Sequence, residues 1–182
     1  TTDGERVYAY FGSQGLYAYD FHGNQVWFAD VGSVGTIGMG VGTSPVLHDG
    51  KVIVQVDRET GDDSYIGAFD ARTGEPAWRV ERRVQSSWST PLLAQANGRS
   101  ELITSGYESI ISYDPRTGTE LWRAGGLESN VIASPLAADG RIIVSAGYPR
   151  KITRALSLGG RGDLGNDHFL WSYDKGTGYI PS

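Results

Sequence analysis

Three residues near the middle of the chain have side chains that could bind a ligand. Arg82 and Arg83 are adjacent, and their guanidinium groups could bind an anion. Trp88 follows in the stretch SSWSTP, and its ring could stack on a sugar or contact a peptide. A structural role stays open for each of them. The arginines could form the solvated end of a strand, with Glu81 partly offsetting their charge, and Trp88 could be a packing aromatic.

Other residue types that carry out chemistry are present without the spacing that it needs. The three histidines, His22, His48 and His168, lie far apart in three turn-like stretches, with no pair at the spacing of a zinc site. No serine stands in the Gly-x-Ser-x-Gly setting of a hydrolase nucleophile. Residues 32–42, GSVGTIGMGVG, have neither a dinucleotide fingerprint nor a phosphate-binding lysine, so they are interpreted as a flexible connection. These observations indicate no metal site and no catalytic residues.

One polar loop leaves a cation site open as an alternative. Residues 159–167, GGRGDLGND, resemble a calcium-binding repeat, but Leu164 stands where that motif needs a carboxylate. Asp163, Asn166 and Asp167 could still offer oxygen ligands to a hard cation. A plain polar loop is the interpretation that the sequence favours.

Composition excludes several classes of function. The chain has 182 residues, with 21 acidic against 16 basic side chains and no long basic run, so it lacks the positive surface of a nucleic-acid-binding protein. No apolar stretch approaches the roughly 20 residues of a membrane-spanning helix. Cysteine is absent, which excludes disulfides and thiolate metal sites. The 26 glycines and ten tyrosines, with no helical periodicity, predict an all-β fold of short strands and tight turns.

A repeated motif organises these strands. The stretch AFDARTGEPAWRVE at 68–81 returns as SYDPRTGTELWRAG at 112–125, and earlier as a version that is one residue shorter. Its fourth version is degenerate and carries an insertion before its tryptophan. The motif aspartates are Asp20, Asp70 and Asp114, and the motif tryptophans are Trp27, Trp78, Trp122 and Trp171. The tryptophans follow one another at intervals of 51, 44 and 49 residues, as expected for a repeat protein.

A second marker keeps the same phase. Ser-Pro or Thr-Pro at 44–45, 90–91 and 134–135 each begins an apolar run that ends at a turn. Each repeat therefore has four predicted strands, which in the second repeat span about 43–47, 51–57, 65–70 and 76–83. Four antiparallel strands in roughly 45 residues make a β-propeller blade. The prediction is a single all-β propeller segment of four four-stranded antiparallel blades, at about 1–42, 43–88, 89–132 and 133–182.

The chemistry of the motif suits contacts between blades. The Asp70 carboxylate can accept hydrogen bonds from the N–H groups of the turn, and Gly74 can adopt the positive φ that closes it. Trp78 then places a large ring on the outermost strand, where packing against the next blade would bury about 200 Å². We therefore expect all four motif tryptophans to be buried between blades.

The motif Ala-x-Asp-x-x-Thr-Gly-x-x-x-Trp resembles the tryptophan-docking motif of the pyrroloquinoline quinone (PQQ)-like β-propellers. Residues 68–78 match it in full, and the resemblance extends over the whole chain. The family includes quinoprotein dehydrogenases, which hold PQQ and Ca²⁺, and non-catalytic scaffolds such as the lipoprotein of the outer-membrane β-barrel assembly machine. Alcohol-oxidising members typically cover PQQ with a vicinal disulfide, which a chain without cysteine cannot form.

The resemblance thus favours a non-catalytic binding or scaffold module without a cofactor, acting on an unknown protein or small ligand outside the cytoplasm. A fragment of a PQQ-dependent dehydrogenase is the alternative, and a sugar- or peptide-binding propeller that uses Trp88 is a third possibility.

The ends of the chain predict a partner. Aligned at Asp-Gly, Thr1–Gly4 match Leu47–Gly50, and Pro181-Ser182 fall where Thr43-Ser44 stand, so the chain holds about four repeats. The family resemblance implies rings of eight blades, and an open arc would leave two blade faces bare. We therefore expect a head-to-tail homodimer that completes an eight-bladed ring.

Overall fold

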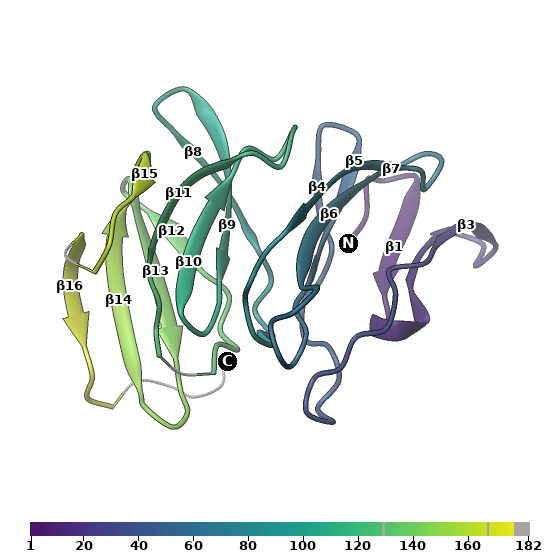
Figure 1. Cartoon of the computed structure of the whole chain (residues 1–182). Helices are drawn as coiled ribbons and strands as arrows, with labels where there is room; N and C mark the ends of the chain where they lie inside the picture. The colour runs from purple at the N-terminus through teal and green to yellow at the C-terminus, as the bar shows by residue number, and fades with distance from the viewer. Residues whose placement is uncertain (129, 167, 177–182) are drawn as a thin grey trace.

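Four antiparallel sheets follow one another along the chain in the computed structural model, which describes residues 1–128, 130–166 and 168–176 (Figure 1). Blade 1 contains β1 (Arg6–Tyr10), β2 (Leu16–Asp20) and β3 (Gln25–Ala29). Blade 2 contains β4 (Val46–His48), β5 (Lys51–Val56), β6 (Tyr65–Asp70) and β7 (Pro76–Glu81). The sequence predicted the four strands of blade 2 at nearly these bounds.

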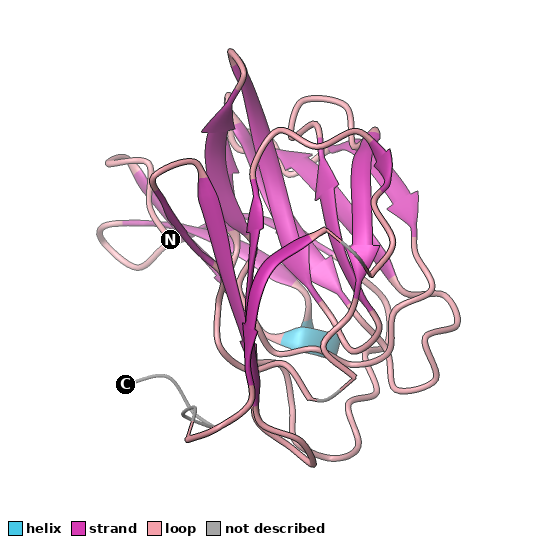
Figure 2. Cartoon of the chain, turned by 90° about the vertical axis from the view of Figure 1, so that its left-hand side faces the viewer, coloured by secondary structure: helices cyan, strands magenta, loops and turns pink. Residues whose placement is uncertain are grey.

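The second half of the chain repeats this arrangement. Blade 3 contains β8 (Leu92–Ala96), β9 (Arg99–Ser105), β10 (Ser109–Tyr113) and β11 (Glu120–Gly125). Blade 4 contains β12 (Leu136–Ala138), β13 (Arg141–Ala146), β14 (Ile152–Ser157) and β16 (Phe169–Tyr173). In the described residues the only helical element is the short turn η1 (Gly12–Gln14), so the all-β prediction is confirmed (Figure 2).

The central strands of blade 2 are apolar on both sides because this blade lies between blades 1 and 3. β5 reads KVIVQV and β6 reads YIGAFD, and five of the six residues in each strand are buried. By contrast, β3 at the outer edge of blade 1 alternates between exposed and buried positions. This difference follows the rule that a strand covered on both faces loses its polar alternation.

The hairpins between the first and second strands of blades 2, 3 and 4 have the turn chemistry that their sequences predict. Asp49-Gly50, Asn97-Gly98 and Asp139-Gly140 all have positive φ at both residues. Two successive positive φ values define the tight turn whose twist matches antiparallel strands, and Asn-Gly and Asp-Gly pairs favour it.

The first blade departs from this pattern at its inner edge. Aligned at Asp-Gly, Thr2 corresponds to His48, which pairs with Lys51 directly after its turn, so Thr2 would lie opposite Glu5. Thr2 instead forms its bridge with Val7, two residues further along, so that alignment is wrong. The cause is the Asp3 carboxylate, whose Oδ1 accepts hydrogen bonds from the N–H groups of Glu5 and Arg6. The residues aligned at the other end, Pro181-Ser182, lie outside the described part of the chain.

The insertion in the fourth repeat forms an extra strand in blade 3. Within it, β15 (Gly162–Asp163) pairs in parallel with the outer strand β11, opposite Trp122 and Arg123. The polar loop expected at 159–167 is therefore partly a strand that covers an open sheet edge, which limits pairing with other chains. Asp163 Oδ1 accepts a hydrogen bond from the N–H of Gly165, and Asp167 is outside the described residues.

Three hydrophobic cores lie between the four blades. One core joins blades 1 and 2, the next joins blades 2 and 3, and the third joins blades 3 and 4. Figure 1 shows the blades as an open arc, with β1 and β3 at one end and β16 at the other. Among the described residues, an arc leaves one face of its first blade and one face of its last blade without a neighbour.

Candidate binding surfaces

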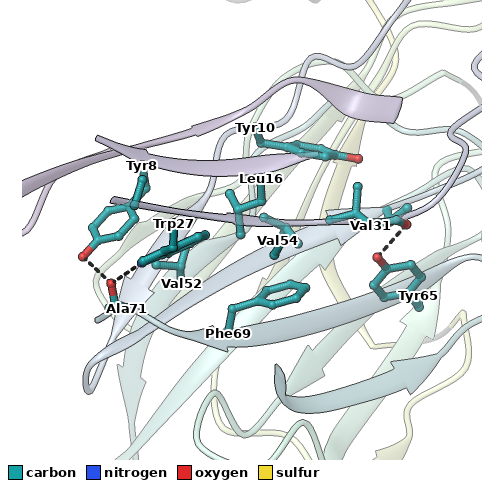
Figure 3. Packing of buried hydrophobic residues seen from close by; sticks show 13 residues of the cluster. Tyr8, Tyr10, Leu16, Trp27, Val31, Val52, Val54, Tyr65, Phe69 and Ala71 are labelled. Carbon is teal, nitrogen blue, oxygen red and sulfur yellow. Dashed lines mark hydrogen bonds between the residues drawn. The ribbon is translucent and has the colours of Figure 1, made fainter. Parts of the chain in front are cut away.

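The tryptophan motif forms a repeated contact between neighbouring blades. The Trp27 ring of blade 1 lies over Gly74 of blade 2, so closely that a Cβ placed on Gly74 would be 2.7 Å from the ring. Its indole N–H donates a 2.9 Å hydrogen bond to the carbonyl oxygen of Ala71 (Figure 3). Trp78 repeats this arrangement over Gly118, with its N–H 3.2 Å from the Pro115 carbonyl oxygen.

The motif glycine therefore has two functions. Gly74 and Gly118 have φ values of 77° and 76°, which close the turn as the sequence predicted. Each also presents a flat patch of backbone on which the preceding blade's tryptophan packs. The second function was not predicted. The constant spacing between the motif glycine and the motif tryptophan could have indicated it.

Trp122 docks differently because the fourth repeat is degenerate. Its ring packs near Gly160, where an added Cβ would be 3.3 Å away. Its indole N–H donates to Glu101 Oε2 at 2.8 Å instead of to a turn carbonyl. Glu101 is fully buried and is also paired with Arg99, whose guanidinium donates to the Gly160 carbonyl oxygen. A charged pair thus joins blades 3 and 4 at this contact.

The motif aspartates organise the turns that receive the tryptophans. Asp70 Oδ1 accepts hydrogen bonds from the N–H groups of Arg72 and Thr73. The bond from Thr73 is the main reason why the pKa of Asp70 lies below its usual value. Asn24 has the corresponding effect on Asp20, whose pKa is also lowered. The ionised carboxylate is therefore the form that holds the turn.

Asp114 makes the same kind of turn with a different balance of effects. Partial burial acts to raise its pKa, but hydrogen bonds from the Arg116 side chain and backbone outweigh burial and leave the pKa lowered. All three predicted aspartates thus lie at their expected places in the turns.

The Ser-Pro and Thr-Pro marker links the inner ends of the blades. The backbone N–H of Ser44 donates to the Thr90 hydroxyl at 3.0 Å, and the N–H of Thr90 donates to the Ser134 hydroxyl at 3.0 Å. Each hydroxyl therefore receives a hydrogen bond from the blade before it. The marker was predicted as the start of a strand, and this link between blades was missed.

Trp88 is covered by the glycine-rich loop that precedes blade 2. Its indole N–H donates to the Gly40 carbonyl oxygen at 2.9 Å, and its side chain lies against Gly42, where a Cβ would be 2.9 Å away. The residue is 9% exposed. The loop at 32–42 thus packs on Trp88, and little of the ring is open to a sugar, a peptide or a quinone. Alignment of the repeats places Gly42, Ile132 and Ile180 at the position of Trp88, and Ile180 lies outside the described residues.

Arg82 is not a solvated strand end, and that expectation is wrong. Its side chain is 2% exposed and pairs with Asp57 through two guanidinium nitrogens, Nε at 3.0 Å and Nη2 at 3.1 Å. A third nitrogen, Nη1, donates to the Thr104 hydroxyl at 2.8 Å. The Ser87 hydroxyl donates to Asp57 at 2.6 Å. Burial raises the pKa of Asp57, and the Arg82 charge and the Ser87 hydrogen bond oppose that rise.

Arg83 is exposed, in contrast to Arg82 and Trp88. It borders a surface hollow of about 400 Å³ together with Arg82, Asp62, Asp63 and Glu81. The three acidic side chains make the hollow unfavourable for an anion. Arg82 does not offset their charge, because its own charge is already neutralised by Asp57. The structure therefore does not bring Arg82, Arg83 and Trp88 together as one open site.

The exposed face of blade 1 is rich in aromatic side chains. We call it the blade 1 face, and it comprises Val7, Phe11, Tyr17, Tyr19 and Phe28. Tyr17 is central, with ring centroids 5.8 Å from Phe11, 5.9 Å from Tyr19 and 4.9 Å from Phe28. Phe11 and Phe28 are about half exposed. At the equivalent positions of blade 2, Val52 and Phe69 are buried against blade 1.

The opposite end of the arc carries a second uncovered face. We call it the blade 4 face, and it comprises Leu136, Ile143, Trp171 and Tyr173, which cross-strand pairing places on one side of the sheet. Trp27 and Trp122 are buried, and Trp78 is half-buried. Trp171 is 44% exposed, so the expectation that all four motif tryptophans are buried is wrong for it. The reason is that no described part of this chain lies beyond blade 4 to cover it.

The described residues contain neither a cluster of metal ligands nor a helix that could span a membrane. Within 1–128, 130–166 and 168–176, no group of three or more acidic or histidine side chains could hold a metal ion. No helix in the same residues has the length and apolar character needed to cross a bilayer.

The repeated four-stranded blade, with a tryptophan of one blade packed on a glycine of the next, agrees with a match of the sequence to a known family. The sequence model described as outer membrane protein assembly factor BamB matches residues 1–86 and 62–180. The chain belongs to this family of PQQ-repeat β-propellers. No curated protein matches the chain in sequence.

Solved structures share the fold at low identity. BamB from Moraxella catarrhalis is 17% identical, with a TM-score of 0.68 over 96% of this chain and 50% of that chain. The quinohemoprotein alcohol dehydrogenase ADHIIG from Pseudomonas putida HK5 is 18% identical, with a TM-score of 0.61 over 93% of this chain and 32% of that one. The quinohemoprotein alcohol dehydrogenase from Comamonas testosteroni is 18% identical, with a TM-score of 0.61 over 93% of this chain and 34% of that one. This chain therefore spans half or less of these proteins.

Proposed function

We propose that this chain is a non-catalytic PQQ-repeat propeller module that acts by binding another protein. The observation that carries the proposal is the pair of uncovered blade faces. Six apolar side chains on them are 36–64% exposed, although equivalent side chains inside the arc, such as Val52 and Phe69, are buried. Contiguous apolar surface of this kind marks an interaction site. The partner favoured here is a second copy of the chain, which would give a head-to-tail homodimer.

A cofactor-dependent function fits the residues less well. A quinone would need an open aromatic face and Ca²⁺ would need a group of oxygen ligands. Trp88 is covered by the loop at 32–42, and its N–H is already bonded to Gly40. Arg82 is held in a buried pair and is not free for a ligand. No step of a redox reaction is therefore assigned to this chain.

The alternative is a fragment of a PQQ-dependent dehydrogenase, which the fold shared with the two alcohol dehydrogenases favours. Incubation with PQQ and Ca²⁺, followed by desalting, distinguishes the two functions. The binding module retains no quinone absorbance. Retention of one equivalent for each complete ring would overturn the proposal and support the dehydrogenase fragment.

The proposed compartment follows from the family alone. Its model is described as an outer membrane assembly factor, so we propose a periplasmic or otherwise extracytoplasmic location. Fractionation of the source cells tests this, and recovery of the native protein only from the cytoplasm would contradict it.

A further inference from the structure

We infer that the blade 4 face of one chain docks on the blade 1 face of a second copy, with Trp171 packed over Gly23 of that copy. The inference rests on the proposed function, because it names the contact through which the binding module would act. One chain carries both surfaces of the contact, an exposed tryptophan at one end and an uncovered motif glycine at the other. The tryptophan–glycine contacts inside the arc are the template for it.

The glycines of the four motif turns carry the main observation. A Cβ on Gly74, Gly118 or Gly160 would lie 2.7, 2.7 or 3.3 Å from the tryptophan ring of the preceding blade. A Cβ on Gly23 would meet nothing within 4 Å. Gly23 has a positive φ of 86°, as Gly74 and Gly118 do with 77° and 76°, so its turn presents the docking surface without a ring on it. Trp171 is the motif tryptophan that is left exposed at the other end of the arc.

The template also predicts the hydrogen bond of the new contact. Trp27 and Trp78 each donate to the carbonyl oxygen of the residue after a motif aspartate, namely Ala71 and Pro115. The residue after Asp20 is Phe21. We therefore expect the Trp171 indole N–H to donate to the Phe21 carbonyl oxygen of the second copy.

The surroundings of the two residues suit a larger interface. Val7, Phe11 and Tyr19 would lie against the second copy as their equivalents Val52, Val56 and Phe69 lie against blade 1 inside the arc. On the other side, Leu136 and Tyr173 share the face of Trp171 and are 64% and 54% exposed. Docking would remove this apolar area from water, and burial of apolar area is the main driving force of association.

The shape of the arc favours two copies. In Figure 1, β3 and β16 lie at opposite ends of the arc, so β16, which carries Trp171, does not lie beside the turn that leads into β3 of its own chain. A twofold axis along the centre of the arc would place each blade 4 face on the other copy's blade 1 face. This arrangement forms two identical contacts and leaves no face bare, as expected of a closed symmetric dimer. The chain superposes on half of the longer Moraxella protein, which agrees with an arc that is part of a larger propeller.

Two variants of the whole chain test the contact by sedimentation. Trp171→Ala removes the ring, and Gly23→Asn keeps a residue that tolerates positive φ while placing a side chain on the docking surface. Loss of a central aromatic anchor weakens binding by about 30-fold or more. Because the dimer has two such contacts, we expect its dissociation constant to rise by about 1,000-fold in the Trp171→Ala variant.

The controls change equivalent residues away from both faces. Gly50→Asn alters another glycine with positive φ and open space around it, and Met39→Ala removes an exposed apolar side chain. Both are expected to dimerise like the unmodified chain. Circular dichroism checks that every variant keeps its β structure.

Mixing the two variants shows whether the two residues meet. A mixed dimer of Trp171→Ala with Gly23→Asn carries both changes at one contact and an unaltered Trp171 and Gly23 at the other. The mixture should therefore associate about 30-fold more tightly than either variant alone. A contact in which Trp171 meets Trp171 would give no such recovery.

The outcomes separate this inference from the proposed function. A dimer that both variants weaken, with recovery on mixing, supports the contact. A dimer that is indifferent to both variants overturns the Trp171–Gly23 contact and leaves the binding function standing. A monomeric unmodified chain overturns the self-association, and quinone retention, measured separately, overturns the function.

Discussion

Replacing Trp27 by alanine removes the docking ring between blades 1 and 2. An aromatic side chain buries about 150–250 Å², which at about 25 cal/mol/Å² corresponds to roughly 4–6 kcal/mol. The loss is smaller than this figure because Trp27 is 7% exposed in the folded chain and because alanine keeps the buried Cβ. We expect the free energy of unfolding to fall by about 3–5 kcal/mol.

The Trp27→Phe variant separates packing from hydrogen bonding. Phenylalanine retains an aromatic ring over Gly74 and loses the 2.9 Å bond to the Ala71 carbonyl oxygen. The Tyr8 hydroxyl is 3.0 Å from the same carbonyl, so that oxygen keeps a partner (Figure 3). We therefore expect a loss of about 1–2 kcal/mol, from one hydrogen bond and a smaller ring.

Urea unfolding followed by circular dichroism measures both variants. Met39→Ala is the control, because Met39 is 70% exposed and its loss should change stability by less than about 0.5 kcal/mol. A Trp27→Ala variant within about 1 kcal/mol of this control would refute the argument that the tryptophans hold the blades together.

Three further predictions use the same unfolding assay. Gly74→Ala should destabilise the chain by about 1–3 kcal/mol more than Gly50→Ala, because both glycines have positive φ but only Gly74 lies under a ring; equal losses would contradict this. Arg82→Met should lower the free energy of unfolding by about 3–5 kcal/mol at neutral pH, because it leaves Asp57 buried and unpaired. The loss should be smaller in acid, where Asp57 is protonated. A loss that does not change with pH would argue against an ionised pair. Asp70 has a lowered pKa in the folded chain, so its advantage over Asp70→Asn should be complete above the ordinary value of 3.8 and disappear as the pH falls below it; an advantage that persists in acid would exclude the carboxylate as its source.

The fold was predictable because its main signal is repeated. Trp27, Trp78 and Trp122 each stand four residues after a motif glycine and seven or eight after a motif aspartate, and their packing between blades follows from that local motif. The Asp-Gly and Asn-Gly turns were predictable for the same reason, since their φ values depend on the two residues themselves.

Features that depend on distant partners were not predictable. Arg82 and Arg83 look alike in the sequence, but only Arg82 meets Asp57, which is 25 residues earlier in the chain. The signal that existed was the polar Asp57 directly after the apolar strand β5. Trp171 is the motif tryptophan of the degenerate fourth repeat, and its burial depends on a neighbouring blade and not on its own repeat. The two-residue strand β15 depends on the open edge of β11, which local sequence does not encode.

Light scattering behind a sizing column measures the mass of the assembly and tests self-association most directly. One chain has a mass of 19.6 kDa, so a head-to-tail dimer has a mass of about 39 kDa. We predict the dimer mass at micromolar concentration, with two blade faces covered by the second copy. A stable species of 19.6 kDa would contradict the account, because it would mean that this chain tolerates both exposed faces in water.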